Sequence, residues 1–162
     1  MKKLIIIVLS ALLLAGCAAT PTFETVKDDY LPAAEILQRS VSLKLPKEAA
    51  AQVISGDSGV LYLCDGYEVV RQVMPAGDIS ATLLELTGYQ KDRLSIIETQ
   101  QADYIRYSCV WTAAGETGDV VARAMILDDG QYHYCLTVMA SAENVGQYQA
   151  QWQEIFASYS LG

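Results

Sequence analysis

The second half of the chain constrains the fold most, because four strand-like segments follow one another with only short connections between them. Two of these connections, 114–119 and Asp128-Asp129-Gly130, are rich in the Asp and Gly residues that favour chain reversal. Successive strands joined in this way pair antiparallel. The predicted strands are 94–98, 104–112, 120–127 and 132–140. We therefore expect an antiparallel meander against which the rest of the chain packs.

Signals on either side of the meander predict a hairpin and two helices. Strands at 60–64 and 67–73 flank Asp65-Gly66, a dipeptide that strongly favours a two-residue hairpin turn. Asp78 and Gly88 are suited to cap a helix over 79–87 at its two ends. A final helix over 142–158, capped by Ser141, has an apolar stripe with intervals of three and four residues. The stripe consists of Val145, Tyr148, Trp152, Ile155, Phe156 and Tyr159.

The order of these elements predicts one α+β domain. Its sheet is largely antiparallel, and the mid-chain helix and the C-terminal amphipathic helix pack on it. Before the hairpin, the sequence predicts a short helix at 33–39 that opens at Pro32 and a strand at 41–45 that stops at Pro46. We also expect a helical turn within 47–52 and a reverse turn at 56–59.

The first 17 residues are organised like a bacterial lipoprotein signal. Lys2 and Lys3 precede an apolar run at 4–14 that is too short to span a bilayer. The run ends in Leu14-Ala15-Gly16-Cys17, which resembles a lipobox. This resemblance implies cleavage before Cys17 and attachment of diacylglycerol and acyl chains such as palmitate to that residue. The implied regions are a signal peptide at 1–16, lipidated Cys17 with its tether at 17–31, and a single globular domain at 32–162.

The lipid on Cys17 implies attachment to the extracytoplasmic face of a bacterial membrane. That membrane is the outer one if the cell has two, because Ala18 and not Asp follows the cysteine. Loss of residues 1–16 removes two lysines and no acid, so the net charge changes from −8 to about −10. Such a domain repels nucleic acid and anionic lipid headgroups. The sequence therefore excludes nucleic-acid binding and leaves the anchoring to the lipid.

Several of the predicted elements together resemble the PsbP-like α/β/α sandwich. These are the segment at 41–46, the Asp65-Gly66 hairpin, the mid-chain helix and the closing stripe at 152–159. The resemblance covers residues 40–160. The PsbP-like group includes many bacterial lipoproteins. It implies the fold and a habit of binding partners or assisting assembly. It implies no catalytic residues.

The three remaining cysteines, Cys64, Cys109 and Cys135, all fall within predicted strands. Turns centred near 116 and 129 would place Cys109 opposite Arg123 and Arg123 opposite Cys135. The two cysteines would then be about 9.6 Å apart, two strand spacings, which exceeds the roughly 7 Å limit for a disulfide. Whether Cys64 pairs with Cys109 or Cys135 stays open. His133 would share a face with Cys135, but without the spacing of a metal site we predict neither a metal nor a cofactor.

The sequence contains no convincing catalytic set. Ser58 lies in Gly56-Asp-Ser-Gly59, a tetrapeptide that also surrounds protease nucleophiles, but a serine nucleophile needs a base and an acid to activate it. His133 is the only histidine of the chain. We therefore predict a non-enzymatic binding or assembly module. The alternative is an envelope hydrolase or redox protein that uses His133, Cys135 or Ser58.

Aromatic side chains are concentrated in the meander, and two arginines lie on the same strands. Cross-strand aromatic pairs stabilise a sheet by roughly 0.2–1 kcal/mol each, and tyrosine also favours interfaces. The residues are thus either structural or a surface for an envelope protein or small ligand. They are Tyr104, Arg106, Tyr107, Trp111, Arg123, Tyr132 and Tyr134.

Overall fold

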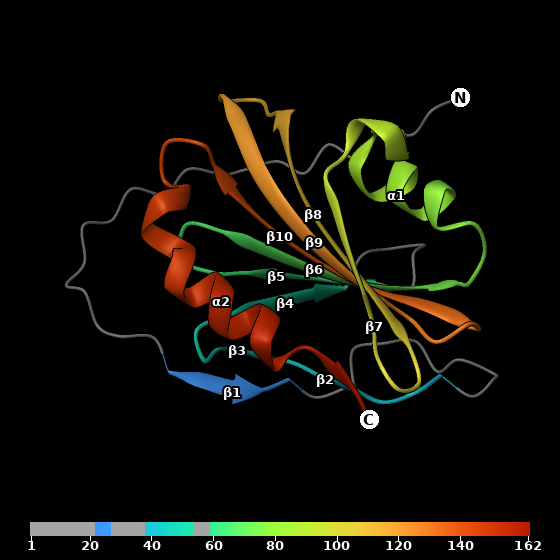
Figure 1. The fold of residues 1–162 in the computed structure, drawn as a ribbon. Helices are drawn as coiled ribbons and strands as arrows, with labels where there is room; N and C mark the ends of the chain where they lie inside the picture. Colours follow the sequence, from blue (N-terminus) through green and yellow to red (C-terminus); the bar gives the residue numbers. More distant parts are fainter. Residues whose placement is uncertain (1–21, 27–37, 54–58) are drawn as a thin grey trace.

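The computed structural model describes residues 22–26, 38–53 and 59–162, and within them it contains eleven strands and two α-helices (Figure 1). Short 3-10 helices occupy Lys91–Arg93 and Val145–Tyr148. The strands before α1 are β1 (Phe23–Thr25), β2 (Val41–Ser42), β3 (Lys44–Pro46), β4 (Ala50–Val53), β5 (Gly59–Leu63) and β6 (Glu68–Pro75). The later elements are α1 (Ile79–Thr87), β7 (Ile96–Gln100), β8 (Ile105–Ala114), β9 (Asp119–Asp128), β10 (Tyr132–Ser141), α2 (Gln149–Ser158) and β11 (Ser160–Leu161).

Seven strands form one antiparallel sheet in the order β4-β5-β6-β10-β9-β8-β7. The predicted meander is β7 to β10, and the predicted hairpin is β5 and β6. Gly66 has the positive φ of 80° that the hairpin turn requires. Two small antiparallel pairs, β1-β3 and β11-β2, complete the described strands. The α+β fold with a largely antiparallel sheet is therefore confirmed.

The two helices lie on opposite faces of the sheet. Leu83 of α1 is fully buried in a cluster with Cys109, Ala124 and Cys135, and we name this side the α1 face. Trp152, Ile155 and Phe156 of α2 are buried in a second cluster with Leu136 and Val138, which defines the α2 face. Figure 1 shows α1 and α2 well separated on the sheet. The apolar stripe predicted for the closing helix packs as expected.

Helix α1 has the predicted bounds. The Asp78 side chain accepts a hydrogen bond of 2.9 Å from the Ser80 N–H, as an N-cap residue does. Gly88 ends the helix with φ 75°, and its N–H donates to the Leu84 carbonyl at 2.9 Å. Of the apolar residues, Leu83 faces the sheet, whereas Leu84 is 41% exposed.

Two of the local expectations are wrong. The helical turn expected within 47–52 is instead a turn at Lys47 and Glu48 followed by β4, because pairing with β5 overrides the local preference. The final helix begins at Gln149, since a turn at 142–144 and a 3-10 helix come first. The expected helix at 33–39 lies largely outside the described residues, and Gln38 and Arg39 are irregular.

The strand register of the meander also differs from the expectation. We predicted Cys109 opposite Arg123 and Arg123 opposite Cys135, but Cys109 lies opposite Ala124 and Cys135 opposite Ile126. A shift of one residue moves side chains to the other face of a sheet. Arg123 therefore belongs to the α2 face, whereas both cysteines lie on the α1 face.

The geometry of the two reversals explains this shift. In the first, the Gly115 N–H donates to the Gly118 carbonyl at 2.9 Å, so the turn is centred between residues and not on one. In the second, the Asp129 carboxylate accepts hydrogen bonds from the N–H groups of Gln131 and Tyr132, at 2.9 and 2.8 Å. These bonds move the reversal toward Gln131. Register is set by such turn details, which local composition fixes only weakly.

The hairpin turn gives a test of the packing between β5-β6 and the segment before α2. Gly66 requires a positive φ, and a Cβ atom placed there would overlap the Tyr148 hydroxyl. Tyr148 also packs against Tyr67, with ring centroids 5.1 Å apart. We expect Gly66→Ala to lower the free energy of unfolding by about 1–3 kcal/mol, measured by urea denaturation.

Gly77→Ala is the matched control, because no atom lies within 4 Å of a Cβ at Gly77 and its φ is not positive. Its effect should stay within about 0.5 kcal/mol. Equal effects of the two substitutions would contradict the steric role of Gly66.

Candidate functional site

The only histidine of the chain lies in a buried polar cluster under α1. His133 Nδ1 is 2.7 Å from the Thr82 hydroxyl on α1, and Nε2 is 3.5 Å from a carboxylate oxygen of Asp128. Cys135 shares the α1 face with His133, as predicted, and its thiol lies 3.9 Å from the Met74 sulfur. His133 has no exposed surface and Cys135 is 1% exposed. His133 and Cys135 therefore lie between α1 and the sheet without contact to solvent, whereas the Asp128 side chain is 18% exposed.

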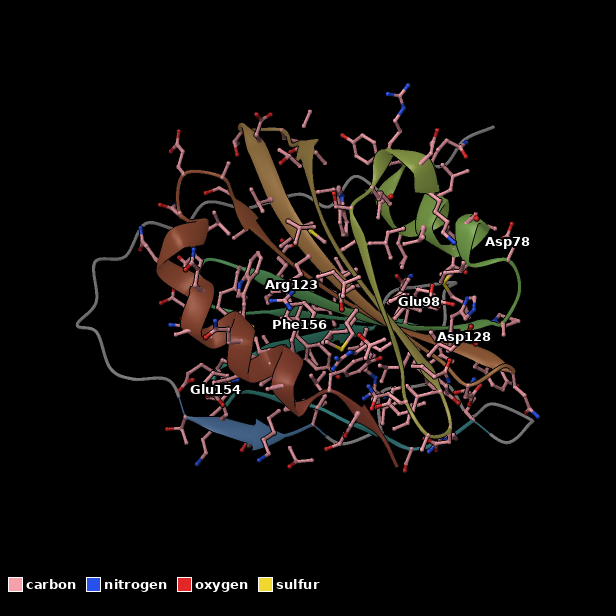
Figure 2. All side chains as sticks on the ribbon, in the orientation of Figure 1. Asp78, Glu98, Arg123, Asp128, Glu154 and Phe156 are labelled. Carbon is pink, nitrogen blue, oxygen red and sulfur yellow. The ribbon has the colours of Figure 1, made fainter. Side chains whose placement is uncertain are left out.

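A second group of polar side chains lies nearby on the α1 face. Burial raises the pKa of the Tyr107 hydroxyl, and the carboxylates of Glu98 and Asp128 raise it further. Figure 2 shows Glu98 and Asp128 in the same part of the sheet. Burial and these two carboxylates therefore keep the Tyr107 hydroxyl protonated. Within 22–26, 38–53 and 59–162, no three His, Cys, Asp or Glu side chains are arranged to hold a metal ion.

The remaining residues that the sequence singles out for possible chemistry are Ser58 and the other two cysteines. Ser58 lies outside the described residues, so its position relative to His133 is not part of the structure. Cys109 and Cys135 are separated by β9, as expected, and Cys64 lies just after β5 at the hairpin turn. All three thiols are free in the structure.

Burial keeps these thiols protonated. It raises the pKa of Cys64 to about 12, against a smaller lowering by its hydrogen bond with Tyr67. Burial also raises the pKa of Cys109 and, together with Glu85, that of Cys135. Since the thiolate is the nucleophile and the metal ligand, these cysteines are poorly suited to redox or metal chemistry near neutral pH.

Alkylation tests this protonation state. In folded Cys17→Ser protein at pH 8, we expect iodoacetamide to leave Cys64, Cys109 and Cys135 unmodified, and to modify all three after unfolding in guanidinium, as measured by intact mass. A raised folded-state pKa makes the folded protein bind more protons than the unfolded chain above about pH 8.5. The free energy of unfolding should therefore decrease as the pH rises from there toward 12. Rapid alkylation of folded Cys64 at pH 8 would contradict this assignment.

The predicted seven-residue surface is divided between the two faces of the sheet. Tyr107 and Trp111 are buried on the α1 face. Tyr134 is buried on the α2 face, where its hydroxyl donates to Asp129 at 3.1 Å and accepts from the Arg39 N–H at 2.8 Å. Tyr104 and Tyr132 pack partly buried against the same core. The aromatic residues thus contribute mainly to the two cores.

The two arginines, in contrast, are partly exposed on the α2 face, Arg106 on β8 and Arg123 on β9, at or beyond the border of the part that α2 covers. Arg123 marks the border, because its guanidinium carbon lies 4.4 Å from the centre of the Phe156 ring of α2 (Figure 2). Val110 lies directly opposite Arg123 and is 56% exposed. We name this surface the open face and define it as Ile97, Arg106, Val110, Thr112 and Arg123.

Ile97 adds a second exposed apolar side chain to the open face. It is 70% exposed and lies opposite Ser108, one pleat from Val110. The two arginines belong to the surface predicted from the sequence, whereas Ile97 and Val110 do not. A usable signal was present: Val110 alternates in phase with Ser108 and Thr112, so it is an apolar residue at a position of the polar face.

The fold is shared by solved structures with little sequence identity. Cyanobacterial PsbP (CyanoP) from Synechocystis sp. PCC 6803 aligns with a TM-score of 0.60 and 7% identity, covering 93% of this chain and 99% of that one. The Ran-binding protein Mog1p of Saccharomyces cerevisiae aligns with a TM-score of 0.53 and 11% identity, covering 88% and 96%. LpqN, involved in cell envelope biogenesis of Mycobacterium tuberculosis, gives 0.53 and 10%, covering 88% and 92%.

These likenesses show a PsbP-like α+β fold and no more, because fold and function are only loosely linked. No protein-family model and no curated protein matches the chain by sequence. In the part of the chain that the structure describes, no helix combines the length and hydropathy needed to cross a bilayer.

Proposed function

We propose that this protein is a lipid-anchored binding or assembly module of the bacterial cell envelope, without enzymatic activity, whose partner contacts the open face. The observation that carries the proposal is the presence of two partly exposed arginines and two exposed apolar residues on the α2 face of β7 to β9. Arginine and apolar side chains are enriched at the centres of protein interfaces. This combination is suited to a protein partner.

Charge supports this choice of surface. The chain has 11 basic and 19 acidic residues, so two arginines on the same face of two adjacent strands form a local exception to its acidic character. The Phe156 ring holds the Arg123 side chain in place, so less conformational entropy is lost when a partner binds. An acidic side chain of a partner would pair with these guanidinium groups.

The lipobox supplies the location. In this proposal, residues 1–16 are removed, Cys17 carries the lipid, 17–31 form the tether and 32–162 form the domain on the extracytoplasmic face, facing the periplasm from the outer membrane if there are two membranes. The similarity of fold to LpqN, a protein of cell envelope biogenesis, is in keeping with this location. Each buried CH₂ group of the lipid contributes roughly 0.8 kcal/mol to membrane binding, so two or more chains suffice for stable anchoring.

Lipidation is tested by expression of the full chain in a bacterium that processes lipoproteins. We expect the wild-type protein in the membrane fraction, with an intact mass that corresponds to residues 17–162 plus diacylglycerol and any added acyl chain. Cys17→Ser should abolish the added mass and prevent stable anchoring by lipid. A wild-type protein without added lipid would overturn the anchor.

Binding at the open face is tested by a photo-crosslinking amino acid at Val110 in cells. We expect a discrete crosslinked product, reduced about tenfold or more when Arg106→Ala and Arg123→Ala are combined, because Arg side chains are often interface hot spots. Leu84 is the matched control position, as it is also apolar and exposed but lies on α1. Absence of a product at Val110, or an equal product at Leu84, would contradict binding through the open face.

A further inference from the structure

We propose, resting on the binding function above, that the partner adds an extended segment as a new strand along the free edge of β7. In the order of the seven-stranded sheet, β7 is the last strand and pairs only with β8 among the described strands. An exposed strand edge presents a row of backbone donors and acceptors that can pair with another chain. Strand addition is an established mode of peptide recognition.

The direction of the β7 backbone groups follows from the turn that joins it to β8. The Gln101 N–H donates to the Tyr104 carbonyl at 2.9 Å, so this pair closes the turn as a hydrogen-bonded pair. Bonded and non-bonded pairs alternate along an antiparallel ladder. Ile97 and Thr99 therefore bond to β8, and the N–H and C=O groups of 96, 98 and 100 point to the free edge.

The next turn supports this assignment independently. The Gly115 N–H donates to the Gly118 carbonyl at 2.9 Å, which makes Cys109 and Ala124 a bonded pair of β8 and β9 by the same alternation. Cys109 then bonds to β9 and cannot also bond to its β7 partner, Ile96. The backbone groups of Ile96 thus point away from β8, as the first turn requires.

The edge has one of the usual protections against pairing, a charged side chain, and lacks others within the described residues. Natural edge strands are blocked by charged side chains, lysine above all, and by proline, bulges or covering segments. The register of β7 with β8 runs without a bulge, and Ile96–Gln100 contains neither lysine nor proline. Ile96, Ile97 and Thr99 are β-branched residues, which favour strand pairing. The single charge is the exposed carboxylate of Glu98.

The side chains along β7 specify the sequence of the added strand. Its residue opposite Glu98 lies on the α1 face, where a basic side chain forms the favourable pair. The two neighbours of this residue in the added strand lie on the α2 face, one opposite Ile97 and the other opposite Thr99. The first should be apolar, because Ile97 is 70% exposed. The second should be acidic, because Thr99 lies beside Arg106.

A second copy of this chain does not fit that pattern. Antiparallel pairing of two β7 strands over their full length places Glu98 directly opposite the partner's Glu98. Like charges directly opposite are destabilising in a sheet, and each chain already has a net charge of −8. The occupant is therefore a segment of a different protein that presents an apolar, a basic and an acidic residue in succession.

Glu98→Pro is the decisive variant, tested by the Val110 crosslink in cells. Proline removes an N–H that points to the free edge, so pairing with β8 keeps its hydrogen bonds, and proline is tolerated at such positions. We expect the product to fall about tenfold or more in Glu98→Pro and by less than about fivefold in Glu98→Gln, which keeps the backbone donor and loses only the charge pair. A product that persists in folded Glu98→Pro protein would overturn strand addition and leave the proposed function standing.

Glu98→Lys gives a second readout that does not alter the backbone. It should lower the crosslink several-fold, because it faces the basic residue of the added strand with a like charge. Circular dichroism and thermal unfolding check that each variant folds. If Glu98→Pro does not fold, the crosslink of Glu98→Lys decides whether the strand is added. An unchanged product in Glu98→Lys would exclude the proposed pairing. Absence of any wild-type product would reject both the proposed function and this inference.

Discussion

The structure depends on the burial of strand β10 between β6 and β9. Strand β10 pairs with β6 on one side and with β9 on the other, so it joins the β5-β6 hairpin to the rest of the meander. Its side chains are buried on both faces, with His133 and Cys135 on one side and Tyr134 and Leu136 on the other. A strand buried on both faces needs a covering layer on each. The positions of α1 and α2 follow from this requirement.

The two covering layers are held by different interactions. Helix α2 packs through the apolar cluster of Trp152, Ile155 and Phe156. Helix α1 is short and has one fully buried leucine, so the hydrogen bond between Thr82 and His133 forms an important part of its attachment. A hydrogen-bond partner left unsatisfied at such a buried position costs about 1–3 kcal/mol. This hydrogen bond gives the buried His133 a structural role at the contact between α1 and the sheet.

The sequence predicted those elements whose signals are local. Asp78 and Gly88 determine the ends of α1 by their own side chain and backbone, and Asp65-Gly66 determines the hairpin turn. The register of β8, β9 and β10 could not be predicted, because it depends on the carboxylate bonds of Asp129 and on which glycines close a turn. The open face was predicted only through its arginines. Its extent depends on where α2 stops across the sheet, which is a property of packing between distant segments.

The uneven coverage of the sheet connects the fold with the proposed binding. Helix α2 covers core residues of β10 such as Leu136 and Val138, and toward the edge its Phe156 contacts Arg123 of β9. Beyond that contact, Val110 of β8 and Ile97 of β7 are exposed on the α2 face, and β7 has no second partner among the described strands. A strand added there would shield both apolar side chains and supply the missing backbone pairs at once. The acidic character of the domain disfavours its own second copy and anionic surfaces in this role, and it favours a partner that brings a positive charge to Glu98.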